Sequence, residues 1–208
     1  MNNEETKSRP RASSGRKFYE MTFDYRAAGR HGYELANRDV LVGRSALHAP
    51  SSRGFPDYPE PPLFLFDKRK GRLPRDLEEF DAYWLVSDRM KSVLQAIDAN
   101  GFAFLACDVR SADGSQESVY WLCDVVRVLR GIDETRSRLR IWHHERTGAK
   151  YYSLGNAELK FREDLIGDAH VFRNCYMESC VFCDQKLKDA CQAAGVKGVK
   201  FRDASKPL

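Results

Sequence analysis

The chain has 208 residues, of which 34 are Lys or Arg and 30 are Asp or Glu, which gives a formal net charge of +4. Hydrophobic residues make up 42% and aromatic residues 12% of the chain, a composition that excludes a wholly disordered protein. A chain of this length can bury a core of its own, as one domain or two small ones, and no apolar run is long enough to span a membrane.

The N-terminal 16 residues are polar and basic and have no periodicity, so they predict a disordered tail ahead of a single domain over residues 17–208. This segment also lacks the apolar stretch of a secretory signal, and we therefore expect a cytoplasmic protein with reduced cysteines. Residues 1–17 hold five basic and two acidic residues. Residues 57–124 hold eight basic and thirteen acidic residues, and residues 125–208 hold sixteen and eleven, so the predicted domain is polarised rather than uniformly basic.

Alternating aromatic and polar residues predict a first strand over Lys17–Tyr25. The next segment, Gly43–Pro62, holds five prolines and little periodicity, and it predicts a long surface loop of the kind that often has a function. Apolar runs then predict strands over Leu63–Phe66 and Phe80–Val86. Apolar residues three and four apart predict a helix over Asp88–Ala99 with a single buried face.

The second half of the chain reads mainly as strands. Apolar runs predict strands over Phe102–Val109 and Val119–Leu129, joined by a turn at Asp113-Gly114. Further strands are predicted over Arg138–His144 and Ala157–Phe161, and then in the sequences HVFRN and SCVFCD.

The C-terminal segment CVFCDQKLKDACQAAGVKGVKF resembles the earlier segment WLVSDRMKSVLQAIDANGFAF. The alignment matches Asp184 with Asp88 as the acidic residue at the start of a helix, where it suits the helix dipole. It predicts a second helix over Asp184–Ala194 and a return strand over Val199–Phe201. Two similar strand–helix–strand units on one antiparallel or mixed sheet predict an α+β domain.

The last third of the chain contains four cysteines near a histidine: Cys175, Cys180, Cys183 and Cys191, with His170. The spacing of Cys180 and Cys183 is that of half a zinc site. The internal likeness argues against a metal, because Cys191 stands where the first unit has the core residue Leu94. Residues three apart on a strand also point to opposite faces. We therefore predict that these cysteines fill the core and that no metal binds.

Two sets of residues leave open an enzyme, of a hydrolase-like kind, as the alternative function. Cys183 precedes the second predicted helix, where the dipole lowers the pKa of a thiol, and His170 is a histidine that could accompany it. The acidic cluster between Asp76 and Asp81 could do acid–base chemistry or bind magnesium. Neither set stands in a recognisable catalytic motif, and a solvated acidic face and an unreactive thiol are the simpler explanations.

No glycine-rich loop for phosphate binding occurs, so no cofactor is expected. The adjacent His143 and His144 lie on a predicted strand and face opposite ways, which argues against a shared site. A nucleic-acid-binding module is a further alternative, using the basic tail and the Arg-rich stretch Arg127–Arg140. Basic residues in the last third alternate with acidic ones, however, which is typical of a solvated surface.

An ordered series of segments connects the chain with a known family. It comprises KFYEMTFDY, FDAYWLVSDRMKSVL, YWLCDVVRVLRGIDETRSR, LKFREDLIGDAHVFRN and VFCDQKLKDACQAAGVKGVKF, over residues 17–203. In these segments the chain resembles the bacterial immunity proteins encoded beside polymorphic toxins, a family long described as a domain of unknown function. The resemblance implies a binding protein without catalytic residues.

From this resemblance we expect an immunity protein that binds a cognate effector toxin and occludes its active site, without catalysis. The expected contact surfaces are the Pro-rich loop and the acidic segment, with the residues Phe55, Tyr58, Asp76, Glu78, Glu79 and Asp81. The acidic segment suits electrostatic docking of a basic protein. The hypothesis includes no cofactor, no nucleic acid and no membrane as a partner, and it leaves a homodimer open.

Overall fold

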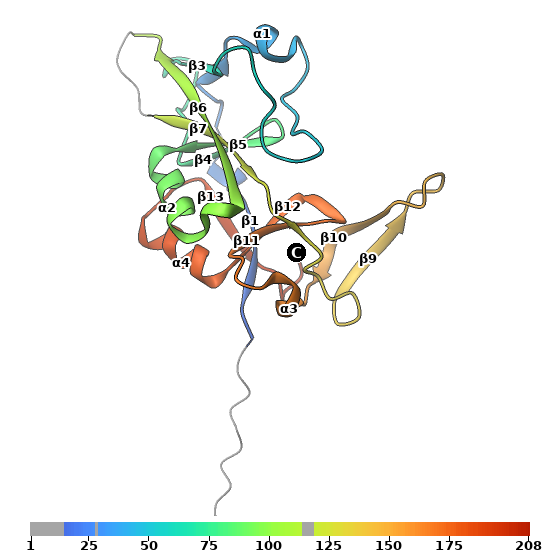
Figure 1. Cartoon of the computed structure of the whole chain (residues 1–208). Helices are drawn as coiled ribbons and strands as arrows, with labels where there is room; N and C mark the ends of the chain where they lie inside the picture. The colour runs from blue at the N-terminus through green and yellow to red at the C-terminus, as the bar shows by residue number, and fades with distance from the viewer. Residues whose placement is uncertain (1–14, 28, 114–118) are drawn as a thin grey trace, which may run out of the picture.

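The computed structural model describes residues 15–27, 29–113 and 119–208 (Figure 1). Within these residues, thirteen strands form three sheets, accompanied by four α-helices and two short 3₁₀ helices. Most strand pairs are antiparallel, and two are parallel. The predicted α+β class is therefore confirmed, with sheet as its main component.

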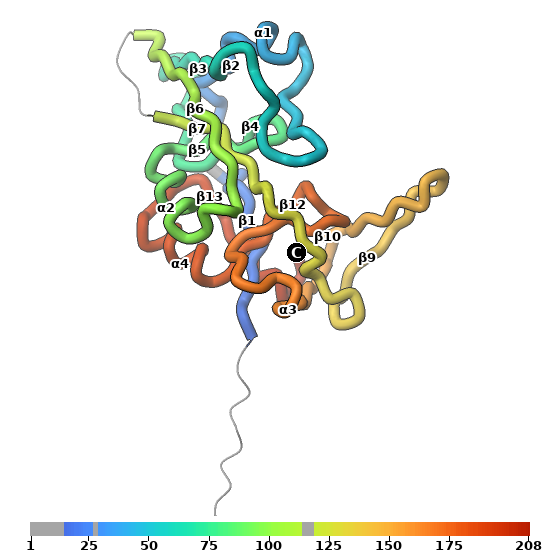
Figure 2. Tube along the Cα trace, viewed as in Figure 1, coloured from blue at the N-terminus to red at the C-terminus, as the bar shows by residue number. Residues whose placement is uncertain are grey.

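The largest sheet has six strands in the order β2 (Tyr33–Leu35), β3 (Leu63–Phe66), β6 (Phe102–Ser111), β7 (Tyr120–Val125), β5 (Tyr83–Ser87) and β4 (Leu77–Phe80). The second sheet has five, in the order β13 (Val199–Asp203), β1 (Phe18–Phe23), β12 (Met177–Asp184), β11 (Val171–Asn174) and β8 (Val128–Leu129). The third is a hairpin of β9 (Arg138–His143) and β10 (Lys150–Glu158), which projects from the body (Figure 2). The helices are α1 (Arg38–Val42), α2 (Asp88–Asp98), α3 (Glu163–Ile166) and α4 (Gln185–Ala193), with 3₁₀ helices at Tyr25–Ala27 and Ala99–Gly101.

The strand β1 lies inside its sheet, between β12 and β13, and both of its faces are covered. Its alternating residues divide between two groups of core side chains, because successive side chains of a strand point to opposite faces. Tyr19 and Met21 join the core group that also contains residues of α2 and α4. Phe18 joins a second group beneath α3, where its ring contacts Phe161 at 4.7 Å. A third group of core side chains lies on the face of the six-stranded sheet that the Pro-rich loop covers.

Helices α2 and α4 pack against each other beside the two large sheets, as the tube view also shows (Figure 2). The predicted buried face of α2 is confirmed, since Met90 and Leu94 are fully buried. In each segment the strands flanking the helix are parallel, with an antiparallel strand between them: β7 in the first case and β1 in the second. The helices begin at different aligned positions, because Ser87 caps α2 whereas Asp184 caps α4. The internal likeness of the two units stays a prediction.

The expectation of one sheet with a single long strand over Val119–Leu129 is wrong. β7 ends at Val125 and β8 begins at Val128, and the two strands belong to different sheets. The chain changes sheets here because Val126 N donates to the carbonyl oxygen of Gly101 at 3.0 Å, after which the carbonyl of Arg127 accepts a hydrogen bond from Arg173 N at 2.8 Å.

Two other strand boundaries differ from the prediction. The strand predicted over Phe80–Val86 is present as β5 but begins at Tyr83, because Phe80 ends β4 and the chain turns at Asp81, whose φ is +53°. The strand predicted over Ala157–Phe161 overlaps β10 only at Ala157 and Glu158, because β10 begins at Lys150, where pairing with β9 starts, and ends at Glu158. The predicted turn at Asp113-Gly114 lies partly outside the described residues. No helix in the described part of the chain is long and apolar enough to cross a bilayer.

Candidate functional site

The acidic segment expected to face a partner comprises β4, the residue before it and the turn after it, and it is buried at its start and exposed at its end. Asp76 and Glu78 are buried, at 6% and 3% exposure, whereas Glu79 and Asp81 are exposed. Leu77, between Asp76 and Glu78 on the opposite face of the strand, is fully buried as well, so the first half of the segment is covered on both faces. The interpretation of the whole segment as one solvated face is wrong for its two buried members.

Glu78 is the centre of a buried arginine cluster. Its carboxylate accepts hydrogen bonds from both terminal nitrogens of Arg72, and from Arg75 through the backbone N (3.0 Å), Nε (2.7 Å) and Nη2 (3.1 Å). Burial alone raises the pKa of this carboxyl, but the bonds from the two arginines outweigh it and lower the pKa to about 2. Glu78 is therefore ionised at neutral pH, and both of its oxygens already accept hydrogen bonds from Arg72 and Arg75.

Asp76 likewise accepts hydrogen bonds that connect β4 with the start of α2 and with the loop before β13. It accepts hydrogen bonds from Ser87 Oγ at 2.7 Å, Arg89 Nη2 at 2.7 Å and Lys197 N at 2.6 Å. Burial raises the pKa of Asp76, and these bonds lower it by more, so the net direction is down. The loop that carries Lys197 lies so close to β4 that a Cβ on Gly198 (φ +89°) would stand 2.2 Å from the Leu77 carbonyl oxygen. Asp76 thus organises a tight junction between β4, α2 and β13.

The Pro-rich loop over Gly43–Pro62 contains no helix or strand, as predicted, but it is packed onto the six-stranded sheet. Phe55 is half-buried, with its ring 4.6 Å from that of Tyr83, and Tyr58 is half-buried as well. The Tyr83 hydroxyl lies within hydrogen-bonding distance of two carbonyl oxygens of the loop. Asp81 Oδ2 accepts a hydrogen bond from Leu47 N at 2.8 Å. The two predicted aromatic contacts therefore hold the loop in place and expose only part of their rings.

A buried carboxylate ties the middle of the loop to both large sheets. Asp124 is fully buried and pairs with Arg53 of the loop and with Arg173 of β11, whose Nη2 lies at 3.4 Å. Its other oxygen accepts a hydrogen bond from Gly54 N at 2.8 Å. Sequence analysis missed this cluster, because the three charges come from segments far apart in the chain.

A hollow of about 330 Å³ lies where the loop, β4 and β12 meet. Its charged lining includes Arg53, Glu79, Asp81 and Glu178. Of the six residues predicted to contact a partner, Glu79 and Asp81 line this hollow, while Phe55 and Tyr58 do not. The structure thus leaves Glu79 as the accessible part of the acidic segment, because the Asp81 carboxylate is paired with Arg38 Nη1 at 2.6 Å and its side chain is only 19% exposed.

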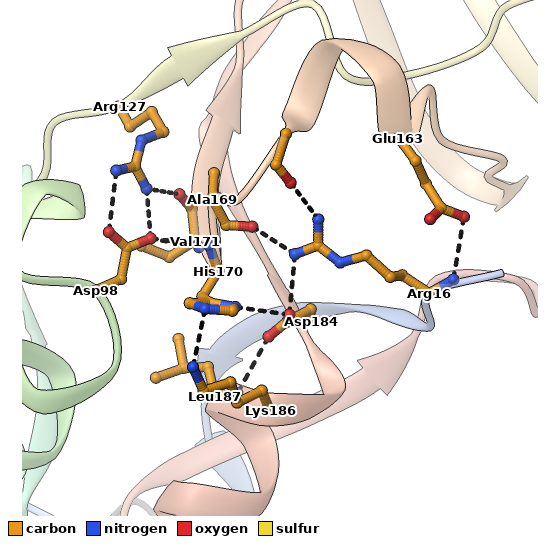
Figure 3. A network of polar contacts seen from close by, with 11 residues as sticks. Arg16, Asp98, Arg127, Glu163, Ala169, His170, Val171, Asp184, Lys186 and Leu187 are labelled. Atoms are coloured by element: carbon orange, nitrogen blue, oxygen red, sulfur yellow. Dashed lines mark hydrogen bonds and ion pairs between the residues drawn. The ribbon is translucent and has the colours of Figure 1, made fainter.

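A second polar network joins Arg16 to the start of α4 (Figure 3). Asp184 Oδ2 accepts a hydrogen bond from Arg16 Nη2 at 2.9 Å and lies 2.8 Å from His170 Nδ1. Arg16 also donates to the carbonyl oxygens of Gly167 and Ala169. Burial raises the pKa of Asp184, but the hydrogen bonds lower it overall. Arg16 belongs to the segment predicted as a tail, and it is bound to the folded body here, while residues 1–14 lie outside the described residues.

The same network continues to the end of α2. Asp98 accepts hydrogen bonds from the Arg127 guanidinium and, at 2.8 Å, from the backbone N of His170 (Figure 3). The Nε2 atom of His170 lies 3.2 Å from Lys186 Nζ. The imidazole is therefore surrounded by groups that fix α2, β11 and α4 relative to one another.

The cysteines that could have served a metal or a nucleophile lie in separate parts of the core. Cys183 and Cys191 are fully buried in the group beside α2 and α4, and Cys180 packs against the group on the other face of β12. The prediction that Cys180 and Cys183 point to opposite faces is confirmed. Burial raises the pKa of the Cys183 thiol well above its usual value and that of Cys191 to about 12. Among the described residues, no group of three or more His, Cys, Asp or Glu is placed to hold a metal ion.

The Arg-rich stretch Arg127–Arg140 is dispersed over several elements. Arg127 pairs with Asp98, and Arg138 pairs with Glu158 across the hairpin at 2.7 Å. The Arg130 guanidinium lies 5.7 Å from the ring centre of Tyr176. These arginines therefore do not form one continuous basic face.

The projecting hairpin presents a surface that sequence analysis missed. We call the segment Arg138–Glu158, which comprises β9, the connecting turn and β10, the arm. Three of the seven large hydrophobic residues that are exposed in the described part of the chain lie on it: Ile141, Trp142 and Tyr151. His143 and His144 are both exposed near its tip. The signal in the sequence was the pair Ile141-Trp142 set among arginines and histidines, where a buried strand would have hydrophobic neighbours.

Comparison with known protein families identifies the chain over most of its length. A family model described as Immunity protein family (Imm11) matches residues 17–206, which is nearly the whole chain. No curated protein matches the chain.

Proposed function

The chain belongs to the Immunity protein family (Imm11), and we propose that it neutralises a cognate toxin in the cytoplasm by binding the toxin directly, without a chemical step. The observation that carries this proposal is the family match, which spans the described fold from β1 to β13 and so concerns the whole domain. An inhibitor of this kind needs an interface of roughly 1,200–2,000 Å² with a few aromatic or arginine anchors.

Two surfaces of the chain support such binding. The hollow beside β4 presents Glu79, which we propose as the acidic contact, with the Asp81–Arg38 pair next to it, while Phe55 and Tyr58 hold the loop beside it. The arm presents Trp142 and Tyr151 away from the two large sheets.

The placement of the potential nucleophile favours binding over catalysis. Cys183 is fully buried and its pKa is raised, whereas a reactive thiol needs access and a lowered pKa. His170, which could have assisted it, hydrogen-bonds the helix-capping Asp184.

Co-expression with the toxin gene adjacent to the gene of this chain tests the proposal. Cells that carry the toxin alone should stop growing, and cells that also carry this chain should grow. The chain should recover the toxin in a pull-down, and an unrelated toxin should be neither recovered nor neutralised. Failure of rescue together with no recovered complex contradicts the proposal.

A further inference from the structure

The arm places two aromatic side chains side by side on one exposed face. Trp142 is 50% exposed and Tyr151 is 47% exposed, and their Cα atoms are directly opposed in the register of β9 and β10. Opposed residues of an antiparallel pair point to the same face of the ribbon. The two rings therefore lie on the same face of the arm, and we call these two side chains the aromatic patch.

The opposite face of the arm is fastened to the body. Tyr152 is 7% exposed, its hydroxyl donates to Glu134 Oε1 at 2.5 Å, and its backbone N donates to the carbonyl oxygen of Tyr176 at 2.9 Å. Lys150 Nζ lies 2.5 Å from the same oxygen of Glu134. These contacts fix which face of the arm is turned outward. An arm held in this way before binding loses less conformational entropy when it meets a partner.

A bulge in β10, which has three more residues there than the paired part of β9, bends the arm away from the rest of the fold. The register with β9 shifts between Ser153 and Glu158, and Asn156 in this bulge has φ of +59°. A bulge bends the strand that carries it and increases the local twist. The outer part of the hairpin is thereby directed away from the two large sheets (Figures 1 and 2).

The charge around the aromatic patch is positive. Arg140 lies two residues from Trp142 on β9 and so shares its face, and Arg146 lies in the turn at the tip. Neither arginine forms an ion pair with another residue in the described ranges. Glu145 is the acidic residue of the segment 139–157, which also holds Lys150. Trp, Tyr and Arg are the residue types most enriched among the residues that dominate binding energy.

We propose that the arm inserts into an acidic cleft of the toxin, with Trp142 and Tyr151 against an apolar floor and Arg140 and Arg146 opposite carboxylates at the rim. This inference rests on the proposed function, since it names the surface that the neutralised toxin would contact. It also specifies the chemistry of the toxin surface that meets the arm, because a basic arm is complementary to an acidic surface, whereas Glu79 would face a different, basic part of the toxin. Nucleic acid is the less favoured partner, since binding a nucleic-acid chain takes more phosphate contacts than Arg140 and Arg146 can supply.

The test is isothermal titration calorimetry of the full chain against the product of the adjacent toxin gene, prepared as an inactive variant. Trp142→Ala should weaken binding about 30-fold, as expected for a central aromatic anchor. The double change Arg140→Glu and Arg146→Glu should weaken it about tenfold and reduce its dependence on salt. Leu165→Ala is the control, because it removes a large hydrophobic side chain that is 44% exposed on α3, away from both the arm's outer face and the hollow, and it should change the affinity by less than about twofold.

The outcomes separate the arm from the proposed function. If the unchanged chain binds the toxin and the arm variants bind equally well, the arm is not the contact, although the proposed function stands. If the unchanged chain neither binds nor protects, the proposed function itself fails. Light scattering of the chain alone and binding of a single-stranded RNA oligonucleotide complete the test. A dimer that Trp142→Ala dissociates, or RNA binding that Trp142→Ala abolishes, overturns the proposal. All variants should keep the circular dichroism and melting temperature of the unchanged chain, because the changed residues are exposed.

Discussion

Replacing Glu78 with Gln tests whether the buried half of the acidic segment serves the fold rather than a partner. Glu78 is 3% exposed and its carboxylate accepts five hydrogen bonds from Arg72 and Arg75. Its pKa falls from 4.5 to about 2 on folding. By linkage, that difference corresponds to about 3 kcal/mol of unfolding free energy at neutral pH.

The sign of the pH dependence follows from the lowered pKa. The ionised carboxylate stabilises the fold fully above pH 4.5, the unfolded value, and this contribution is lost as the pH falls toward 2. Glu78→Gln should therefore lower the unfolding free energy by about 3 kcal/mol at neutral pH but by only about 1 kcal/mol near pH 3. Taking the difference between the two proteins at each pH cancels the other carboxylates, such as Asp76 and Asp98, that titrate in both.

Urea unfolding followed by tryptophan fluorescence measures this difference, since Trp84 is buried in the core beside β4. The control is Glu79→Gln at the next position of β4, where the side chain is exposed and partial desolvation raises the pKa. It should change the unfolding free energy by less than about 0.5 kcal/mol. Equal stability of Glu78→Gln and the unchanged chain, or a difference that does not shrink in acid, would refute the reasoning.

Two further predictions concern the polar network and the cysteines. Asp184→Ala should lower the unfolding free energy by about 2 kcal/mol, because it removes the cap on Leu187 N and the contacts with Arg16 and His170. In urea unfolding, a loss no larger than that of the exposed Asp189→Ala would contradict this. The thiols of Cys183 and Cys191 should resist a thiol-specific reagent in the native protein at neutral pH and react after unfolding in urea, since both are fully buried with raised pKa values. Rapid native reaction of Cys183 in that titration would revive an enzymatic role.

Elements with strong local signals could be predicted from the sequence. The strand β1 and the helix α2 were each predicted from the residue pattern within one short segment, and the structure contains both. The five-residue helix α1 and the three-residue strand β2 were not predicted, because elements this short carry little periodic signal and depend on tertiary contacts. The order of strands within the sheets also depends on pairings between distant segments.

The candidate site shows the same division. The acidic segment lies near Arg72, Arg75 and Arg89 in the sequence, but the spacing does not predict which carboxylate each arginine pairs with. Asp76 and Glu78 are buried together with Leu77 between them, so strand alternation alone could not tell which carboxylates of the segment lie inside. The exposure of Trp142 could not be predicted from the sequence either, since it depends on how the arm is placed relative to the two large sheets.

The most direct test of binding without catalysis is a titration of toxin activity with the purified chain. Inhibition should rise linearly and become complete at one molecule of the chain per toxin molecule, and the toxin released from the complex should be active and unchanged in mass. Protection by far fewer molecules of the chain than of toxin, or a toxin recovered with an altered mass, would contradict a stoichiometric inhibitor and indicate an enzyme.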